Sequence, residues 1–200
     1  MDITWHGNTC YACREKGVSV VVNPDEKAGP LKGDLVLTSL GEKTAKVEGA
    51  TQVFDWPGEY EMKDVPVIGF QAWKQSKKNE ETEGKKSEAT LIFRFEIGGI
   101  KVCHLGELGH TLTSDMVKEI GDVDVLMMAA GEGENLDNKK AMEILEAIDP
   151  RVLMLMGKGD HTSLLKELGA DQVQELEKFS VKSKSELPED KRMYVILKKS

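Results

Sequence analysis

Residues 103–110 constrain the fold of this chain more than any other segment. They read Cys-His-Leu-Gly-Glu-Leu-Gly-His, so the carboxylate of Glu107 stands between His104 and His110 and is flanked by glycines. The apolar residues that lead into the segment predict a buried strand. A carboxylate and imidazoles at the end of a strand are typical of a metal-site loop, because zinc binds nitrogen and oxygen donors. The segment therefore predicts a sheet with a metal-type loop at its edge.

The chain has few histidines for a site of this kind. The chain contains four histidines, which are His6, His104, His110 and His161. A pair of zinc ions takes about four to five ligands for each ion. The sequence therefore suggests either a hydrolase with an unusual site or a scaffold that has lost its metals.

Strands dominate the first half of the chain, and strands alternate with helices in the second. Runs of β-branched residues broken by Gly, Pro and Asp predict strands at 3–5, 18–22, 34–38, 51–54 and 65–70. The pair Gly98-Gly99 predicts a hairpin that joins strands 90–95 and 100–105, since both residues tolerate positive φ.

Further apolar runs predict strands at 123–128, 151–156 and 193–197. Apolar spacing and end signals predict helices at 113–120, 138–148 and 162–168. The pattern alone indicates the α/β or α+β class.

Composition indicates one domain over residues 1–200, since a hydrophobic content of 40% suffices for one compact core. Within it, residues 74–88 lack any large apolar side chain, which predicts a mobile polar loop.

The net charge of −8 and the lack of a clustered basic face argue against nucleic-acid binding. No apolar run of about 18 residues is present, so we expect no membrane partner. The first residues show no basic region followed by an apolar stretch, which predicts a cytoplasmic protein without a signal peptide. The sequence leaves open whether the partner is a protein or a small molecule, and whether the chain forms an oligomer.

Five segments in a fixed order resemble one known family. They are residues 5–10 (Trp-His-Gly-Asn-Thr-Cys), 20–24 (Val-Val-Val-Asn-Pro), 56–61 (Trp-Pro-Gly-Glu-Tyr-Glu), 104–110 and 149–156. In this order they resemble the small Zn-dependent hydrolase-like branch of the metallo-β-lactamase-fold superfamily, and the likeness covers almost the whole chain. The resemblance implies a four-layer αββα sandwich with the site at the edge between two sheets.

The metal ligands of that family are largely replaced here. Its main motif, His-x-His-x-Asp-His, follows a strand that residues 33–38 resemble, but the next six residues read Ser-Leu-Gly-Glu-Lys-Thr. On this register Ser39, Gly41 and Thr44 stand for histidines, and Lys43 stands for the ligating Asp.

Two outlying ligand positions are also changed. The late Met-His of the branch is Met156-Gly157 here, and its early Gly-His is Gly7-Asn8. On this resemblance Glu107 alone keeps a donor suited to a divalent cation, in the place of an Asp. The flanking His104 and His110 are then predicted to brace the loop by hydrogen bonds.

Lys43 suggests a physical substitute for the metals. A protonated lysine has no lone pair to give to a cation, so at a ligand position it would repel one. We expect Lys43 to lie near Glu107 and to offset its charge, because an unpaired buried charge is strongly disfavoured. The alternative is that Lys43 and Glu42 are solvated at a loop tip.

The sequence leaves three alternative functions open, each from a different class of protein. The first is a pseudoenzyme with a binding or scaffolding role, for which we predict no metal or other cofactor. The second is a hydrolase with a rebuilt, mononuclear zinc site that uses Glu107 with His104, His110 or His161 to activate water. For His161, a place at the start of a helix is the simpler prediction.

The third function is a metal-free hydrolase or redox protein that uses Cys10 or Cys103, and it requires an exposed thiol of low pKa. Cys10 and Cys13 have C-x-x-C spacing. On a strand, however, these two residues face opposite sides, so ordinary buried cysteines are expected.

Overall fold

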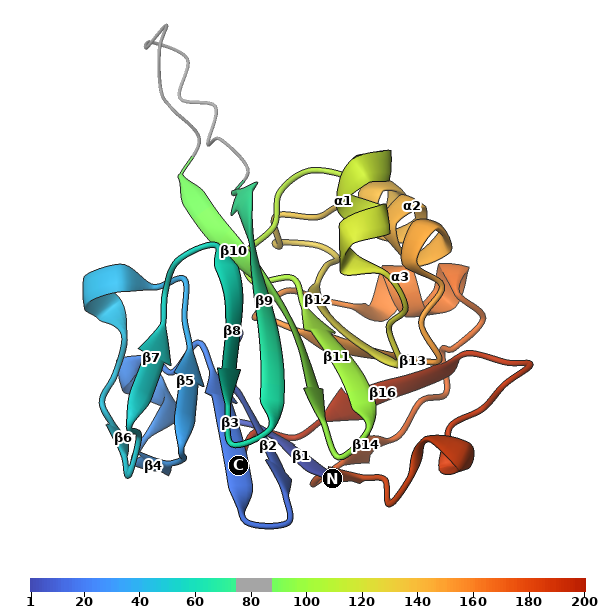
Figure 1. Cartoon of the computed structure of the whole chain (residues 1–200). Helices are drawn as coiled ribbons and strands as arrows, with labels where there is room; N and C mark the ends of the chain where they lie inside the picture. Colours follow the sequence, from blue (N-terminus) through green and yellow to red (C-terminus); the bar gives the residue numbers. More distant parts are fainter. Residues whose placement is uncertain (75–87) are drawn as a thin grey trace, which may run out of the picture.

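Two β-sheets packed face to face form the body of the molecule, with helices on one outer side (Figure 1). The computed structural model describes residues 1–74 and 88–200, and for Glu42 it describes the backbone alone. The loop predicted to be mobile at 74–88 therefore lies, apart from its two end residues, outside the described residues.

The first sheet has six strands in the order β15-β1-β2-β3-β5-β7. Strands β1, β2 and β3 are antiparallel neighbours. Lys16 and Gly17 both take positive φ and close a tight turn between β2 and β3. Strands β3, β5 and β7 run parallel. The bounds are β15 (Phe179–Ser180), β1 (Asp2–Trp5), β2 (Tyr11–Glu15), β3 (Val18–Val22), β5 (Leu35–Leu37) and β7 (Gln52–Phe54).

The second sheet has eight strands in the order β14-β16-β13-β12-β11-β10-β9-β8. The predicted hairpin at Gly98 and Gly99 is confirmed, with φ values of 61° and 75°. Strands β11, β12, β13 and β16 are parallel, so the loops that leave their carboxyl ends emerge at the same edge. The bounds are β14 (Glu175–Leu176), β16 (Met193–Leu197), β13 (Val152–Met156), β12 (Val125–Ala129), β11 (Ile100–His104), β10 (Ala89–Ile97), β9 (Val65–Trp73) and β8 (Gly58–Met62).

The helices α1 (Ser114–Ile120), α2 (Asn138–Ile148) and α3 (Thr162–Glu167) cover the outer face of this sheet (Figure 1). All three begin within one residue of the predicted start. Thr113 caps α1 by accepting a hydrogen bond from the N–H of Met116, and Asp137 caps α2 in the same way through Lys140. The predicted apolar face of α2 is buried.

Side chains fill three layers. The largest cluster lies between the sheets and includes Tyr11, Phe93 and Phe95. A second lies under the helices. A third lies outside the six-stranded sheet, where it is covered by the short 3-10 helix η1 (Glu26–Ala28) and by the paired strands β4 (Leu31–Lys32) and β6 (Val47–Glu48). The predicted four-layer α/β sandwich is confirmed, and in the described residues its layer on this side is thin.

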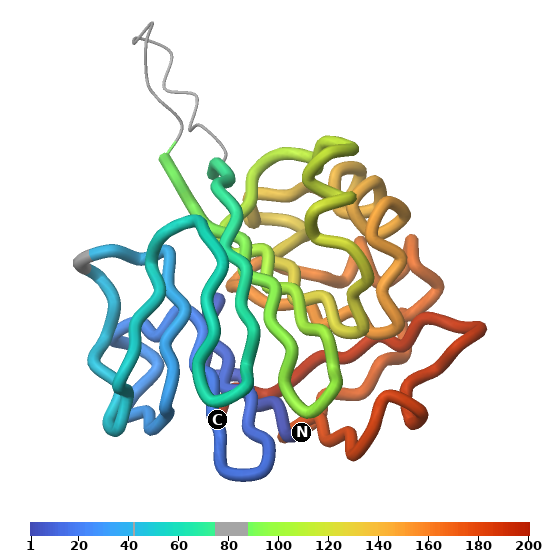
Figure 2. The backbone as a smooth tube through the Cα atoms, in the orientation of Figure 1, coloured from blue at the N-terminus to red at the C-terminus, as the bar shows by residue number. Residues whose placement is uncertain are grey.

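The C-terminal segment ties the two sheets together. It supplies β16 and β14 to the second sheet. It also contacts the first sheet, where β15 pairs with β1 and the backbone of Lys199 forms an isolated parallel β-bridge with Trp5. Figure 2 shows the two ends of the chain on the same side of the sandwich. Two further 3-10 helices are η2 (Gly41–Lys43) and η3 (Lys184–Glu186).

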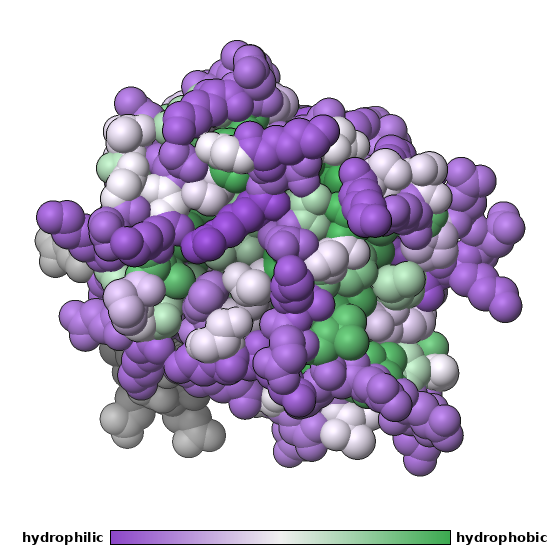
Figure 3. Space-filling model, turned by 90° about the horizontal axis from the view of Figure 1, so that it is seen from below, coloured by the Kyte–Doolittle hydropathy of each residue, from purple (hydrophilic) through white to green (hydrophobic). Residues whose placement is uncertain are grey.

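The surface agrees with the acidic, strongly charged composition. Figure 3 shows one face covered mostly by hydrophilic side chains, with apolar side chains gathered in small patches. Among the described residues, no helix has the length and apolar character needed to cross a membrane.

Removal of the Phe95 ring should test the packing between the sheets. Phe95 is fully buried in the central cluster, so Phe95→Ala should lower the free energy of unfolding by about 3–5 kcal/mol through lost burial and a cavity. Val53 on β7 is 51% exposed, and Val53→Ala should change it by less than about 0.5 kcal/mol. Urea denaturation measures both, and equal effects would contradict the assignment of the core.

Candidate site at the edge of the sandwich

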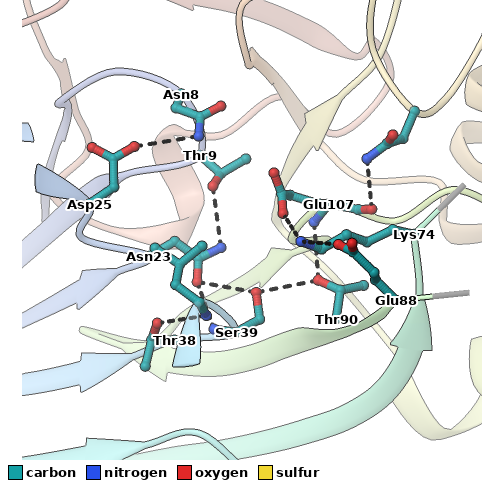
Figure 4. Close-up of polar contacts among 12 residues, drawn as sticks. Asn8, Thr9, Asn23, Asp25, Thr38, Ser39, Lys74, Glu88, Thr90 and Glu107 are labelled. Carbon is teal, nitrogen blue, oxygen red and sulfur yellow. Dashed lines mark hydrogen bonds and ion pairs between the residues drawn. The ribbon is translucent and has the colours of Figure 1, made fainter. Parts of the chain in front are cut away.

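Loops from both sheets meet at the edge of the sandwich and form a chain of hydrogen bonds (Figure 4). The loop after β1 supplies Thr9, the loop after β3 supplies Asn23, and the loop after β5 supplies Ser39. From the second sheet come Thr90 of β10 and Glu107, which follows β11. Positions that the sequence resemblance relates to metal ligands are thus brought together with residues it did not single out.

The hydrogen bonds of this series all run in the same direction, from Glu107 towards Thr9. The N–H of Glu107 donates to Thr90 Oγ1 (3.3 Å), and the Thr90 hydroxyl donates to Ser39 Oγ (3.3 Å). Ser39 donates to Asn23 Oδ1 from its backbone N (2.9 Å) and its hydroxyl (3.4 Å). Asn23 Nδ2 then donates to Thr9 Oγ1 (3.3 Å). The buried polar atoms therefore satisfy one another, as a low-dielectric interior requires.

The side chain of Lys74 contacts Glu107 at one end of this series of hydrogen bonds. Its Nζ lies 2.5 Å from Glu107 Oε2 and 3.5 Å from Glu88 Oε2. The side chains of Lys74 and Glu107 are 24% and 26% exposed, so solvent screens this pair only in part. Burial acts to lower the pKa of Lys74, but the hydrogen bonds and charges of Glu107 and Glu88 outweigh it and hold the pKa above its ordinary value. The ammonium thus stays charged against the carboxylate.

The expectation that Lys43 offsets the charge of Glu107 is not met, because the lysine that pairs with Glu107 in the described residues is Lys74. Lys43 is exposed at the end of η2, and no ion pair links it to any described carboxylate. The family resemblance put Lys43 at a ligand position, whereas Lys74 reaches Glu107 from the end of β9. Lys43 therefore fits the alternative of a solvated loop tip.

Gly41 and Thr44 form no hydrogen bond or ion pair with Glu107 in the part of the chain that the structure describes. Gly41 is exposed at the start of η2 with a φ of 57°. Thr44 Oγ1 lies 2.8 Å from Thr38 Oγ1, so the two hydroxyls share a hydrogen bond at the end of β5. Of the four motif positions, Ser39 is the one that joins the hydrogen-bonded chain.

Gly157 is buried after β13, and its N–H donates to the carbonyl of Asn8 (3.0 Å). The space next to it holds the carboxylate of Glu134, which accepts hydrogen bonds of 2.5 Å from the backbone N of both Lys158 and Gly159. A Cβ atom at position 157 would lie 2.8 Å from Glu134 Oε2 and closer still to the other carboxylate atoms. Glu134 therefore fills the space that a side chain at position 157 would need.

His104 and His110 brace the loop, as the sequence predicted. His104 is fully buried, its Nδ1 accepts from the N–H of Gly106 (3.0 Å), and its Nε2 donates to the carbonyl of Thr9 (2.9 Å). His110 Nδ1 donates to the carbonyl of Thr111 (2.7 Å), and its Nε2 accepts from the N–H of Trp73 (3.3 Å). Both nitrogens of each ring are thus used within the protein.

His161 precedes helix α3 at its N-cap position, which confirms the prediction of a helix-start histidine. Its Nδ1 donates to the carbonyl of Ala130 (2.7 Å), so it links the loops after β12 and β13. This bond fixes the orientation of the His161 ring between the two loops.

The β-lactamase superfamily domain is the family whose model matches residues 2–157. The chain belongs to the metallo-β-lactamase superfamily. A UPF0173 protein of Pyrococcus abyssi is 26% identical, with 80% of this chain and 85% of the relative covered. A Thermotoga maritima protein, described as a Zn-dependent hydrolase of this superfamily, is 28% identical over 98% of both chains, with a TM-score of 0.79.

More distant structures share the fold alone. The metallo-β-lactamase fold protein YhfI of Bacillus subtilis is 11% identical, with 100% of this chain and 97% of YhfI covered and a TM-score of 0.62. At that identity the likeness says nothing about the chemistry of the site, which depends on its own residues.

The residues of this metallo-β-lactamase fold do not fit a zinc pair. Within residues 1–74 and 88–200, no three His, Cys, Asp or Glu side chains converge as metal ligands would. The four positions that the resemblance relates to ligands, 39, 41, 43 and 44, supply a hydroxyl, a glycine, an exposed lysine and a second hydroxyl, and Glu107 is paired with an ammonium. A zinc ion needs about four nitrogen, sulfur or oxygen donors of higher affinity than neutral hydroxyls.

The cysteines of the chain do not form a reactive centre. Cys10, Cys13 and Cys103 are buried and free of disulfides. Burial raises the pKa of each thiol to about 12. Cys13 packs between the sheets and Cys10 on the outer side of the first sheet, so the two face opposite sides as predicted. The requirement of an exposed thiol of low pKa is not met.

Sequence reasoning missed three residues that define the site. Thr90 lies in a strand without any motif, and Glu134 lies in an acidic loop that matches none. Lys74 follows the last strand residue before the polar stretch, and no motif singles it out. In each case the partner is distant in sequence.

Protonation of His104 should affect stability at acidic pH. Burial lowers the pKa of His104 from 6.5 to about 4, so between these values the unfolded chain binds more protons than the folded one. The stabilisation that depends on a neutral His104 is therefore fully present above pH 6.5. It is lost as the pH falls towards 4, which lowers the free energy of unfolding by up to about 3 kcal/mol. His104→Gln, which keeps a donor for Thr9, should remove this component. Urea denaturation across this pH window compares the two proteins, and equal slopes would contradict the assignment.

A side chain at position 157 should conflict with Glu134. Gly157→His should lower the free energy of unfolding by about 1–3 kcal/mol through overpacking, in addition to the strain of its φ of 107°. The substitution should cost less in a Glu134→Ala background, where the space is open. Gly169→His is the matched control, because Gly169 has a φ of 66° and a Cβ added there would meet no atom within 4 Å. Thermal denaturation measures the set, and an equal cost in both backgrounds would contradict the clash.

Proposed function

We propose that this protein is a non-catalytic member of the metallo-β-lactamase superfamily that acts by binding or scaffolding. One observation carries the proposal: the ammonium of Lys74 lies 2.5 Å from the carboxylate of Glu107, at the position that keeps a ligand-type donor. The hydrogen-bonded chain from Glu107 to Thr9 continues this arrangement across the site.

The energetic argument is one of charge compensation. A carboxylate in a partly buried site is costly unless an opposite charge or a metal neutralises it. Here the ammonium of Lys74 supplies the opposite charge, so Glu107 needs no metal ion to neutralise it. A zinc ion would have to displace Lys74 and would still lack further donors, because Ser39 and Thr90 are neutral hydroxyls engaged with each other.

The alternative of a rebuilt mononuclear site finds little support in this geometry. It requires at least three donors at about 2.0–2.2 Å from one metal. His104 and His110 use both ring nitrogens in hydrogen bonds, and His161 is bonded to Ala130. Recruitment of His104 or His110 would break bonds that hold the loop after β11 in place, and His161 with Glu107 alone would supply fewer than three donors.

A cytoplasmic location belongs to this proposal. Its support is the cysteine chemistry: three buried free thiols suit a reducing compartment, where structural disulfides are rare. The acidic net charge of −8 favours a partner other than nucleic acid.

Zinc binding tests the proposal directly. Protein purified without chelators should carry less than about 0.1 zinc, iron or manganese per chain, and calorimetric titration with zinc should show no site tighter than about 10 μM. The reason is the shortage of donors around Glu107. Lys74→Met frees the carboxylate and is expected to leave zinc binding absent, since one carboxylate does not hold the ion.

One or two tightly bound metals per chain would overturn the proposal. A metal bound by Lys74→Met but not by the wild-type protein would mean that Lys74 alone blocks a site whose other ligands are intact. Glu107→Gln in the Lys74→Met background would then show whether Glu107 is a ligand.

A further inference from the structure

A cavity of about 470 Å³ opens beside the site just described. It lies at the carboxyl ends of β13 and β16, against the turn that follows β1. Ligands of α/β proteins often bind at the carboxyl ends of parallel strands, and this volume falls within the usual range for small-molecule pockets. Two former ligand positions, Asn8 and Gly157, are among its lining residues.

The inner wall of the cavity is apolar. Trp5 lines it together with the buried side chains of Met156 and Leu197. The indole of Trp5 is held in place, because its Nε1 donates to the carbonyl of Asn8 (2.9 Å). A fixed, half-buried indole offers a flat surface against which an apolar or aromatic group can pack.

Three lysines surround this wall. Lys27, Lys158 and Lys199 all line the cavity, and none of them forms an ion pair with a described carboxylate. Lysines elsewhere on the surface include paired ones, for example Lys32 with Glu48 and Lys63 with Asp34. In a protein with a net charge of −8, three ammonium groups without carboxylate partners at one cavity form a local concentration of positive charge.

The position of Lys199 is set by the turn after β1. Its Nζ donates to the carbonyl of Lys27 (2.9 Å), and its side chain lies across Gly7, where an added Cβ would be 3.0 Å from Cε. Gly7 has a φ of 98° and thus provides the room for this stem. This bond holds the ammonium at the exposed rim of the cavity.

Two carboxylates also line the cavity. Asp25 accepts hydrogen bonds from the N–H of Lys27 (2.9 Å) and from Asn8 Nδ2 (3.5 Å), so its charge is already engaged in a local cap. Glu175 is exposed on β14. Positive charge exceeds negative charge at the cavity, and the excess attracts an anion.

We infer that this cavity binds a small organic anion, whose apolar body packs on Trp5 and whose carboxylate or phosphate lies among Lys27, Lys158 and Lys199. The inference names a ligand class for the proposed binding function and rests on that function in this respect. The volume accommodates a single aromatic ring with its anionic group.

Phenyl phosphate and phenylacetate are the probes that test this inference, with inorganic phosphate and phenol as partial mimics. The protein carries Trp56→Phe and Trp73→Phe, because these indoles are 71% and 47% exposed outside the cavity, so that fluorescence reports Trp5. Saturable binding of at least one ring-bearing anion below about 10 mM is expected, with phenol and inorganic phosphate at least about tenfold weaker. The stronger of the two anions identifies the head group.

Charge variants provide the decisive comparison. Lys199→Gln and Lys158→Gln should each weaken the binding of the better probe at least about fivefold, which is about 1 kcal/mol. Lys118→Gln on α1 is the matched control and should leave it unchanged, since Lys118 lies outside the cavity lining. Equal affinity in all three variants, or no saturable binding of either probe, would overturn the inference.

The titrations are run with a chelator and repeated with zinc, which separates the two proposals. Probe binding that is lost without zinc would overturn the non-catalytic proposal. Absence of probe binding in both conditions, with no metal bound, would overturn the anion site alone.

Discussion

The packing of the two sheets against each other determines where every loop of this protein lies. Fully buried rings such as Phe93 and Phe95 fill the space between the sheets, and Tyr11 adds a hydrogen bond from its hydroxyl to the carbonyl of Leu155 across it. Because the strands are held in this register, the loops after β1, β3, β5 and β11 converge at one edge. A site formed at this edge depends on that packing more than on any single loop.

At this edge, the charge of a partly buried carboxylate is balanced by a lysine of the same chain. Lys74 neutralises Glu107, and the hydroxyls and amides of Thr90, Ser39 and Asn23 satisfy one another. Glu134 fills the space beside Gly157 and is held by two backbone N–H groups. These contacts pair the polar groups of the edge with one another, next to the cavity lined by Trp5 and Lys199.

Much of the fold could be predicted from local patterns. The apolar face of α2, the Gly98-Gly99 hairpin and the runs in β12 and β13 are properties of short segments, because secondary structure depends on periodicity and turn chemistry. The strand β8 was not predicted, since residues 58–62 lie at a sheet edge and lack a continuous apolar run. Glycine and acidic residues in such a strand weaken the local signal.

The sequence by itself determined the order of the helices and of the longer strands apart from β2 and β8, the family resemblance and the absence of histidine at 39–44, because these depend on residue identity and spacing along the chain. Only the tertiary structure decided that Lys74, and not Lys43, neutralises Glu107, since a choice between two ammonium groups depends on which loop reaches the carboxylate. The same holds for Glu134 at Gly157 and for the three lysines around Trp5. Contacts between residues far apart in the chain are set by strand order and packing, which no local pattern records.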